Sequence, residues 1–112
     1  MTDALLVRPW HDPFLTTLGH DPRSWYAETF WLPTLGPTCL LLLRRIADGF
    51  DRSPEGFVVP ATALSAALGV GERDAKGAPL RKALRRLEQF RLATDDTEST
   101  AVLIRPRLPS VR

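Results

Sequence analysis

The chain has 112 residues, of which 44% are hydrophobic and 25% are charged, and its formal net charge at pH 7 is +2. This length fits one domain with a modest core, and the composition excludes a wholly disordered chain. The longest uninterrupted apolar run, residues 39–43, is far shorter than the ~20 residues that span a bilayer. An acidic start without a long apolar stretch predicts no secretion signal, and the single cysteine, Cys39, predicts no internal disulfide. We therefore expect a cytoplasmic protein.

Residues 1–33 are expected to form an N-terminal arm and a short aromatic helix. The tripeptide His-Asp-Pro occurs at His11 and again at His20. Histidine and aspartate can both bind metal ions. However, aspartate before proline is a typical helix start, with aspartate as the N-cap residue, and the sequence has no third histidine to complete a metal site. We therefore predict two helix starts and no metal or other cofactor.

The second of these starts, at Asp21, leads into an aromatic-rich helix that ends before Pro33. Its aromatic side chains cover more than one face of the helix, so they either pack inside the domain or form a contact between subunits. Internal packing is the simpler interpretation, and a homodimer is the second. The residues of the possible dimer contact are Trp25, Phe30 and Trp31.

The rest of the chain shows a regular succession of apolar patterns separated by turn residues. The predicted elements are a helix from Pro37 to about Asp48, an extended run at 57–59, a helix at 60–68, a basic helix at 79–90, and extended runs at 91–94 and 101–105. The polar turn between the last two runs predicts a β-hairpin.

The order of these elements resembles that of the winged helix-turn-helix domains of bacterial regulators. Two segments, LSAALGVG and LRKALRRLEQFRLA, also resemble parts of these domains. The second is similar to a recognition helix followed by the first strand of a wing. The resemblance covers residues 34–105 and leaves a basic tail at residues 106–112. It implies a mainly α fold: a winged helix-turn-helix domain with a C-terminal β-hairpin and, in this chain, an extra aromatic N-terminal helix.

Basic charge is concentrated in one segment, because residues 76–91 hold six Lys or Arg and one Glu. On a helix, the apolar residues of this segment share one side, the predicted core stripe of Leu80, Ala83, Leu84, Leu87 and Phe90. The opposite side carries the candidate DNA-binding residues Arg81, Lys82, Arg85, Arg86 and Gln89. Arginine can donate paired hydrogen bonds to guanine, and glutamine can do so to adenine. We add Arg105 and Arg107 as expected phosphate contacts.

These observations predict sequence-specific binding of double-stranded DNA by the basic helix, and regulation of transcription. The alternative is a winged-helix module that binds a protein partner through the basic face or the aromatic helix, without binding DNA. The acidic turn at residues 95–98 keeps this alternative open, because a wing that lies along DNA usually carries cations. The sequence has no phosphate-binding loop and no catalytic triad at a recognisable spacing, and Cys39 lies in an apolar helix stripe, so we predict no enzymatic activity.

Overall fold

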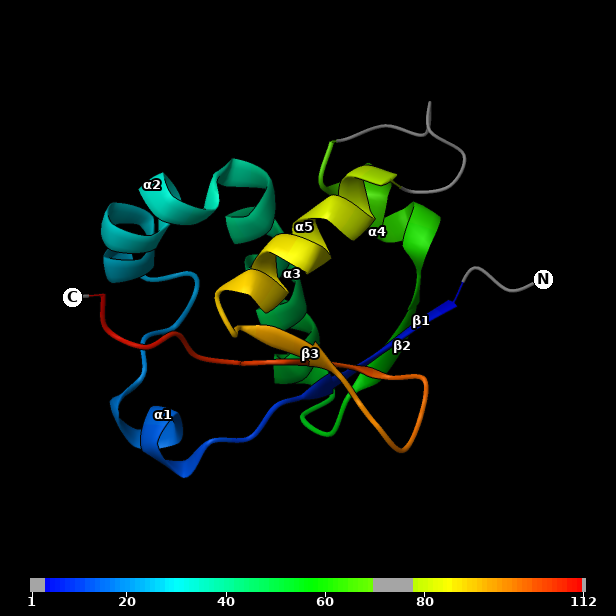
Figure 1. Ribbon diagram of the computed structural model, residues 1–112, viewed down its shortest axis with the longest axis horizontal. Helices are drawn as coiled ribbons and strands as arrows, with labels where there is room; N and C mark the ends of the chain where they lie inside the picture. Colours follow the sequence, from blue (N-terminus) through cyan, green and yellow to red (C-terminus); the bar gives the residue numbers. More distant parts are fainter. Residues whose placement is uncertain (1–3, 70–77, 112) are drawn as a thin grey trace.

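The computed structural model describes residues 4–69 and 78–111. These residues form helices packed on a four-stranded mixed sheet with the strand order β2-β1-β4-β3 (Figure 1). The strands are β1 (Ala4–Pro9), β2 (Phe57–Pro60), β3 (Ala93–Asp95) and β4 (Val102–Ile104). β1 pairs antiparallel with β2 and parallel with β4, while β3 and β4 pair antiparallel as the predicted hairpin.

The predicted fold class, a mainly α winged helix-turn-helix domain, is wrong. Residues 4–9, expected to belong to an arm, form β1 in the middle of the sheet, between β2 and β4. The chain therefore has an α/β fold with a mixed sheet. The sequence signal for β1 is weak because one of the strands that it pairs with, β4, lies near the other end of the chain. Val7 of this strand is fully buried in the core.

The two Asp-Pro pairs adopt different structures. Asp12 is the N-cap of α1 (Pro13–Leu18), as predicted, and its carboxylate accepts a hydrogen bond from an amide of the first turn at 3.0 Å. The carboxylate of Asp21 instead accepts a hydrogen bond from the Arg23 amide at 2.8 Å, in a turn. The second predicted helix therefore starts later in the sequence, after Ser24.

The aromatic helix continues through Pro33 instead of ending before it. Its middle is a π-helical segment, η1 (Ala27–Trp31), and α2 (Leu32–Leu35) follows directly. Proline lacks an amide hydrogen and its ring crowds the preceding turn, so the wider π turn accommodates Pro33 in the first turn of α2. The helix ends at Gly36, whose φ of 87° lies in the left-handed region that favours glycine.

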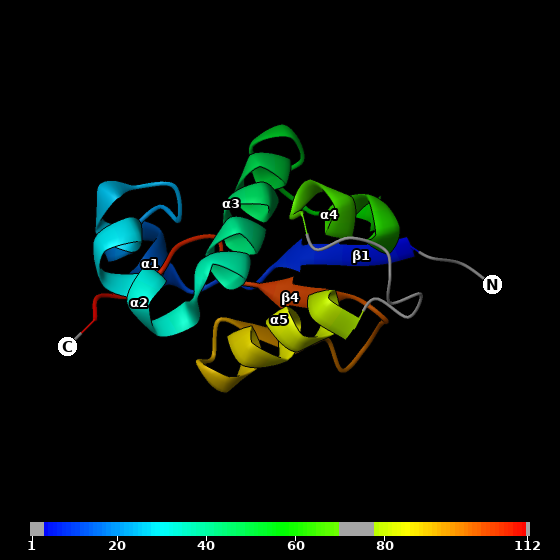
Figure 2. The same ribbon diagram turned by 90° about the horizontal axis from the view of Figure 1, so that it is seen from above.

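Three further helices are α3 (Pro37–Arg52), α4 (Ala61–Ala67) and α5 (Ala78–Gln89). They lie over one face of the sheet, with α5 along one side of the molecule (Figure 2). α3 is longer than predicted because it continues through Gly49 to Arg52. A methyl group at Gly49 would collide with the ring of Phe57, so this ring packs directly against the backbone of α3.

The core lies between the helices and the sheet. Its largest fully buried side chains include Val7, Leu42, Leu43, Ile46, Leu87, Leu92, Ile104 and Leu108. Cys39 is buried among them, as predicted. Leu41, Ala63 and Ala67 continue the apolar spacing of α3 and α4 but are exposed, because each helix buries a narrower face than that spacing indicates.

Candidate nucleic-acid interface

α5 turns its apolar side to the core. Leu80, Ala83 and Leu87 are buried, and Leu84 is half-buried at the edge of the same side. The predicted core stripe is confirmed for these residues, whereas Phe90, at its end, is 36% exposed. The burial of one side fixes the rotation of α5 about its axis and therefore determines which side chains point outward.

The outward side of α5 carries Arg81, Lys82, Arg85 and Gln89, all of them exposed. We call these four residues the outer face of α5. Arg81, Arg85 and Gln89 are spaced at i,i+4, so they form a row along the helix. Within the described part of the chain, none of the three cations has a hydrogen-bond or ion-pair partner. No described carboxylate therefore forms an ion pair with Arg81 or Arg85 that would offset the repulsion between them.

Arg86, in contrast, is bonded within the chain. Its guanidinium donates hydrogen bonds to the carbonyl of Leu35 at 3.1 Å and to that of Thr34 at 2.7 Å, at the C-terminal end of α2. It also lies 5.6 Å from the centre of the Phe90 ring. A cation stabilises a helix C-terminus by bonding to its free carbonyls and by interacting with the helix dipole. Arg86 therefore joins α5 to α2 and is not part of the outer face.

Arg105 and Arg107, predicted as phosphate contacts, also bond inside the molecule. Arg105 donates a hydrogen bond to the Arg91 carbonyl at 2.9 Å and forms an ion pair with Asp12 at 3.3 Å. Its guanidinium carbon lies 3.9 Å from the centre of the Trp10 ring. Arg107 donates two hydrogen bonds to one backbone carbonyl between α1 and η1. Both side chains hold the C-terminal segment against the N-terminal one, so we leave them out of the interface.

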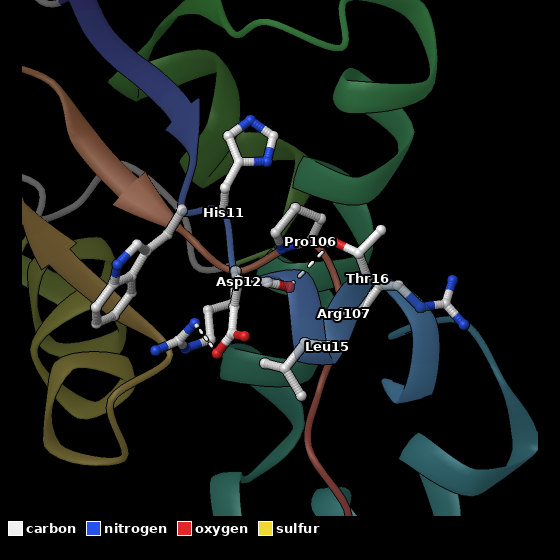
Figure 3. A pocket seen from close by; sticks show the side chains of 8 residues that line it. His11, Asp12, Leu15, Thr16, Pro106 and Arg107 are labelled. Atoms are coloured by element: carbon white, nitrogen blue, oxygen red, sulfur yellow. Dashed lines mark hydrogen bonds and ion pairs between the residues drawn. The ribbon is translucent and has the colours of Figure 1, made fainter.

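A pocket of about 220 Å³ lies between residues 10–16 and residues 105–107 (Figure 3). It is lined by Trp10, His11, Asp12, Leu15, Thr16, Arg105, Pro106 and Arg107. The Asp12 carboxylate is already paired with Arg105, and the Thr16 hydroxyl donates to the Asp12 carbonyl at 3.0 Å. Most ligand sites measure about 300–1,000 Å³ and present free polar groups to the ligand. The small volume and the internal pairing of these groups give no basis for a ligand site here.

Arg91 ends α5 in a conformation that glycine usually adopts. Its φ is 60°. The amides of Arg91 and Leu92 donate to the carbonyls of Glu88 at 3.0 Å and Leu87 at 2.9 Å, the Schellman arrangement of a helix end. Arg91 is exposed and adds a cation beyond the last turn of α5. We did not predict Arg91 as a DNA contact from the sequence, although a cation in the usual place of glycine after a helix is a signal that could identify it.

The clustered acidic side chains lie away from the outer face of α5, around Arg23 and in the turn between β3 and β4. Arg23 pairs with three carboxylates, those of Asp21, Asp48 and Asp51. The hydrogen bonds from Arg23 hold the pKa of Asp21 below its usual value. At the turn between β3 and β4, hydrogen bonds from the Glu98 amide and then from a nearby hydroxyl lower the pKa of Asp96. This acidic turn projects from the sheet away from α5 (Figure 1).

The predicted dimer contact is divided between core and surface. Trp31 is 7% exposed, and its indole N–H donates to the Pro109 carbonyl at 2.9 Å. Trp25 and Phe30 are 74% and 44% exposed, and their rings meet edge to face with centres 6.1 Å apart. Trp31 therefore packs inside the chain, while Trp25 and Phe30 lie at the surface.

No protein-family model, curated protein or solved structure matches the chain. Among residues 4–69 and 78–111 there is no group of three or more His, Cys, Asp or Glu arranged to hold a metal ion. In the same ranges no helix has the length and apolar character to cross a membrane. The outer face of α5 is therefore the feature from which we infer function.

Proposed function

We propose that the chain binds double-stranded DNA through the outer face of α5 and thereby regulates transcription. The observation that carries this proposal is the exposed row of Arg81, Arg85 and Gln89, with Lys82 beside it, on a helix whose other side is buried. Cations gathered on one face of a helix are a typical feature of a nucleic-acid-binding surface. The proposal also requires the cytoplasmic location that we expect from the sequence.

The dimensions of α5 suit the major groove. A helix of 12 residues is about 18 Å long, and the major groove of B-DNA, about 12 Å wide, admits an α-helix. Because α5 lies along one side of the molecule in Figure 2, its outer face can approach a duplex. Phosphates near the helix would offset the repulsion between Arg81 and Arg85.

The side chains of the outer face also have the chemistry that reads bases. Arg81 and Arg85 can each donate two hydrogen bonds to O6 and N7 of guanine, and Gln89 can bond to N6 and N7 of adenine. Lys82 is a compact charge that suits a phosphate, and Arg91 supplies a further exposed cation. Arg86 supports this surface indirectly, because it holds α5 against α2.

Protein binding without DNA is a second candidate function. One observation favours it: Trp25 is 74% exposed and lies against Phe30, and aromatic residues are enriched at protein interfaces. In this case the outer face of α5 would meet an acidic protein surface. The two functions are distinguishable, because only sequence-specific DNA binding enriches a common motif from a pool of duplexes.

Selection of bound duplexes from a random pool tests the proposal. We expect a common motif, and we expect the double variant Arg81→Glu, Arg85→Glu (R81E/R85E) to lose it without unfolding, because both side chains are exposed. The matched control is Arg45→Glu, Arg52→Glu (R45E/R52E), which reverses two exposed cations of α3 and should select the same motif as the natural chain. Failure to enrich a motif, or the same motif from R81E/R85E, would contradict the proposal.

A further inference from the structure

A second surface lies at a groove of about 330 Å³ between α3, β2 and α4. Its apolar lining includes Ile46, Phe57, Val59 and Leu64, and the exposed alanines of α4 form part of one wall. Arg45 and Arg52 of α3 also line it. This volume falls within the range of about 300–1,000 Å³ that is usual for ligand sites. The lining therefore combines an apolar floor with two cations on one side.

β2 forms an edge of the sheet at this groove. In the described sheet it pairs with β1 alone, so the backbone groups on its other side have no strand partner. Val58, in the middle of the strand, is 62% exposed. Phe57 and Val59 alternate with it and pack against the core. An open strand edge beside an apolar groove is the arrangement that accepts an added peptide strand.

Arg45 and Arg52 give this groove its charge. Both are exposed, and neither has a hydrogen-bond or ion-pair partner among the residues that the structure describes. The neighbouring Arg44, in contrast, donates to the Glu28 carboxylate at 3.2 Å and to the Pro22 carbonyl at 3.0 Å. Unpaired cations beside an apolar groove favour a ligand that has both carboxylates and apolar side chains.

We propose that this groove binds an extended, acidic segment of a partner protein. The segment would add as a strand to the open edge of β2, place an apolar side chain between α3 and α4, and pair its carboxylates with Arg45 and Arg52. A second copy of this chain fits less well, because a symmetric contact through β2 would bring these arginines of both copies together. The inference does not depend on DNA binding, since it rests on a different surface.

Display of random short peptides to the immobilised full chain tests this inference. We expect the selected peptides to carry Asp or Glu on both sides of an apolar residue. A fluorescent synthetic copy of the most frequent peptide then gives the affinity by anisotropy. R45E/R52E should weaken this affinity by about tenfold or more, because it removes charge-assisted hydrogen bonds to the peptide.

Two controls separate the groove from general charge and from side-chain contacts alone. R81E/R85E reverses two cations on α5 and should bind the peptide with unchanged affinity. Methylation of the peptide amides, applied in turn to each of the two alternating sets, should abolish binding for the set that faces β2. Circular dichroism checks that both protein variants are folded. The proposal is overturned if no peptide is enriched, if the selected peptides lack acids, if R45E/R52E binds as tightly as the natural chain, or if neither methylated set loses binding.

Discussion

Arg85 and Arg86 are exposed neighbours in α5, and only Arg86 bonds to α2. The Arg86 guanidinium donates to the Thr34 carbonyl at 2.7 Å, whereas Arg85 is exposed and has no hydrogen-bond partner among the described residues. The two adjacent arginines therefore have separate roles. Arg86 stabilises the contact between α5 and α2, and Arg85 is available to a ligand.

This difference predicts unequal effects on stability. Arg86→Ala should lower the free energy of unfolding by about 1 kcal/mol, because it removes the hydrogen bonds to α2 and the contact with Phe90. Arg85→Ala should change it by less than about 0.5 kcal/mol, as is usual for an exposed residue. Urea unfolding of both variants measures the difference. Equal losses would show that the two arginines do not have these roles.

The positive φ of Arg91 leads us to predict a substitution that stabilises the fold and weakens the binding of duplex DNA. Arg91→Gly should raise the free energy of unfolding by about 0.5–1 kcal/mol, because glycine adopts a positive φ without the cost that a side chain imposes. Arg91→Ala, the matched control, keeps that cost and should give no such gain. Both variants should bind duplex DNA more weakly, because both lack the cation. A glycine variant less stable than the alanine variant would contradict this account of the helix end.

The contact between Gly49 and Phe57 predicts a loss of stability in the opposite part of the fold. Gly49→Ala should lower the free energy of unfolding by about 1–3 kcal/mol, because the added methyl group meets the Phe57 ring and forces it out of its packed position. Adding Phe57→Leu to this variant should recover part of the loss, because the smaller side chain leaves room. Thermal unfolding of the single and double variants provides the measurement, and an unchanged midpoint for Gly49→Ala would show that the contact is not tight.

Trp25 and Phe30 predict association of two copies. Their exposed rings form a paired apolar surface that a dimer would bury. Sedimentation velocity at micromolar concentration should show a dimer for the natural chain and a monomer for Trp25→Ala, Phe30→Ala. A natural chain that sediments as a monomer throughout this range would remove the prediction.

Local sequence patterns predict those elements whose packing follows from consecutive residues. Three elements have such a local signal: α5 has its apolar spacing, β2 has a short apolar run, and the β3–β4 hairpin has a polar turn. The structure has these elements in the expected places. A local pattern does not predict β1, because this strand pairs with β4 and Val7 lies opposite Val102, which is far away in the sequence. That pairing converts the expected helical domain into an α/β fold.

For the candidate interface, too, the sequence predicts local features but not contacts between distant residues. The sequence spacing predicts which residues of α5 point away from the core, and Arg81, Lys82, Arg85 and Gln89 are exposed as expected. It does not predict that Arg86, Arg105 and Arg107 bond within the chain, because their acceptors include backbone carbonyls. Every residue has a carbonyl, so the sequence carries no sign of which one lies next to an arginine.

The salt dependence of duplex affinity tests the central claim most directly. Lys82 and Arg91 are the cations that we assign to phosphates, so the logarithm of the binding constant should fall against the logarithm of salt concentration with a slope near −1.8, at about −0.9 per phosphate. Fluorescence anisotropy with a labelled duplex measures this slope for the natural chain, R81E/R85E and R45E/R52E. We predict that R81E/R85E loses measurable binding while R45E/R52E keeps the slope. Binding that is insensitive to salt, or that R81E/R85E retains in full, would contradict the assignment of DNA binding to α5.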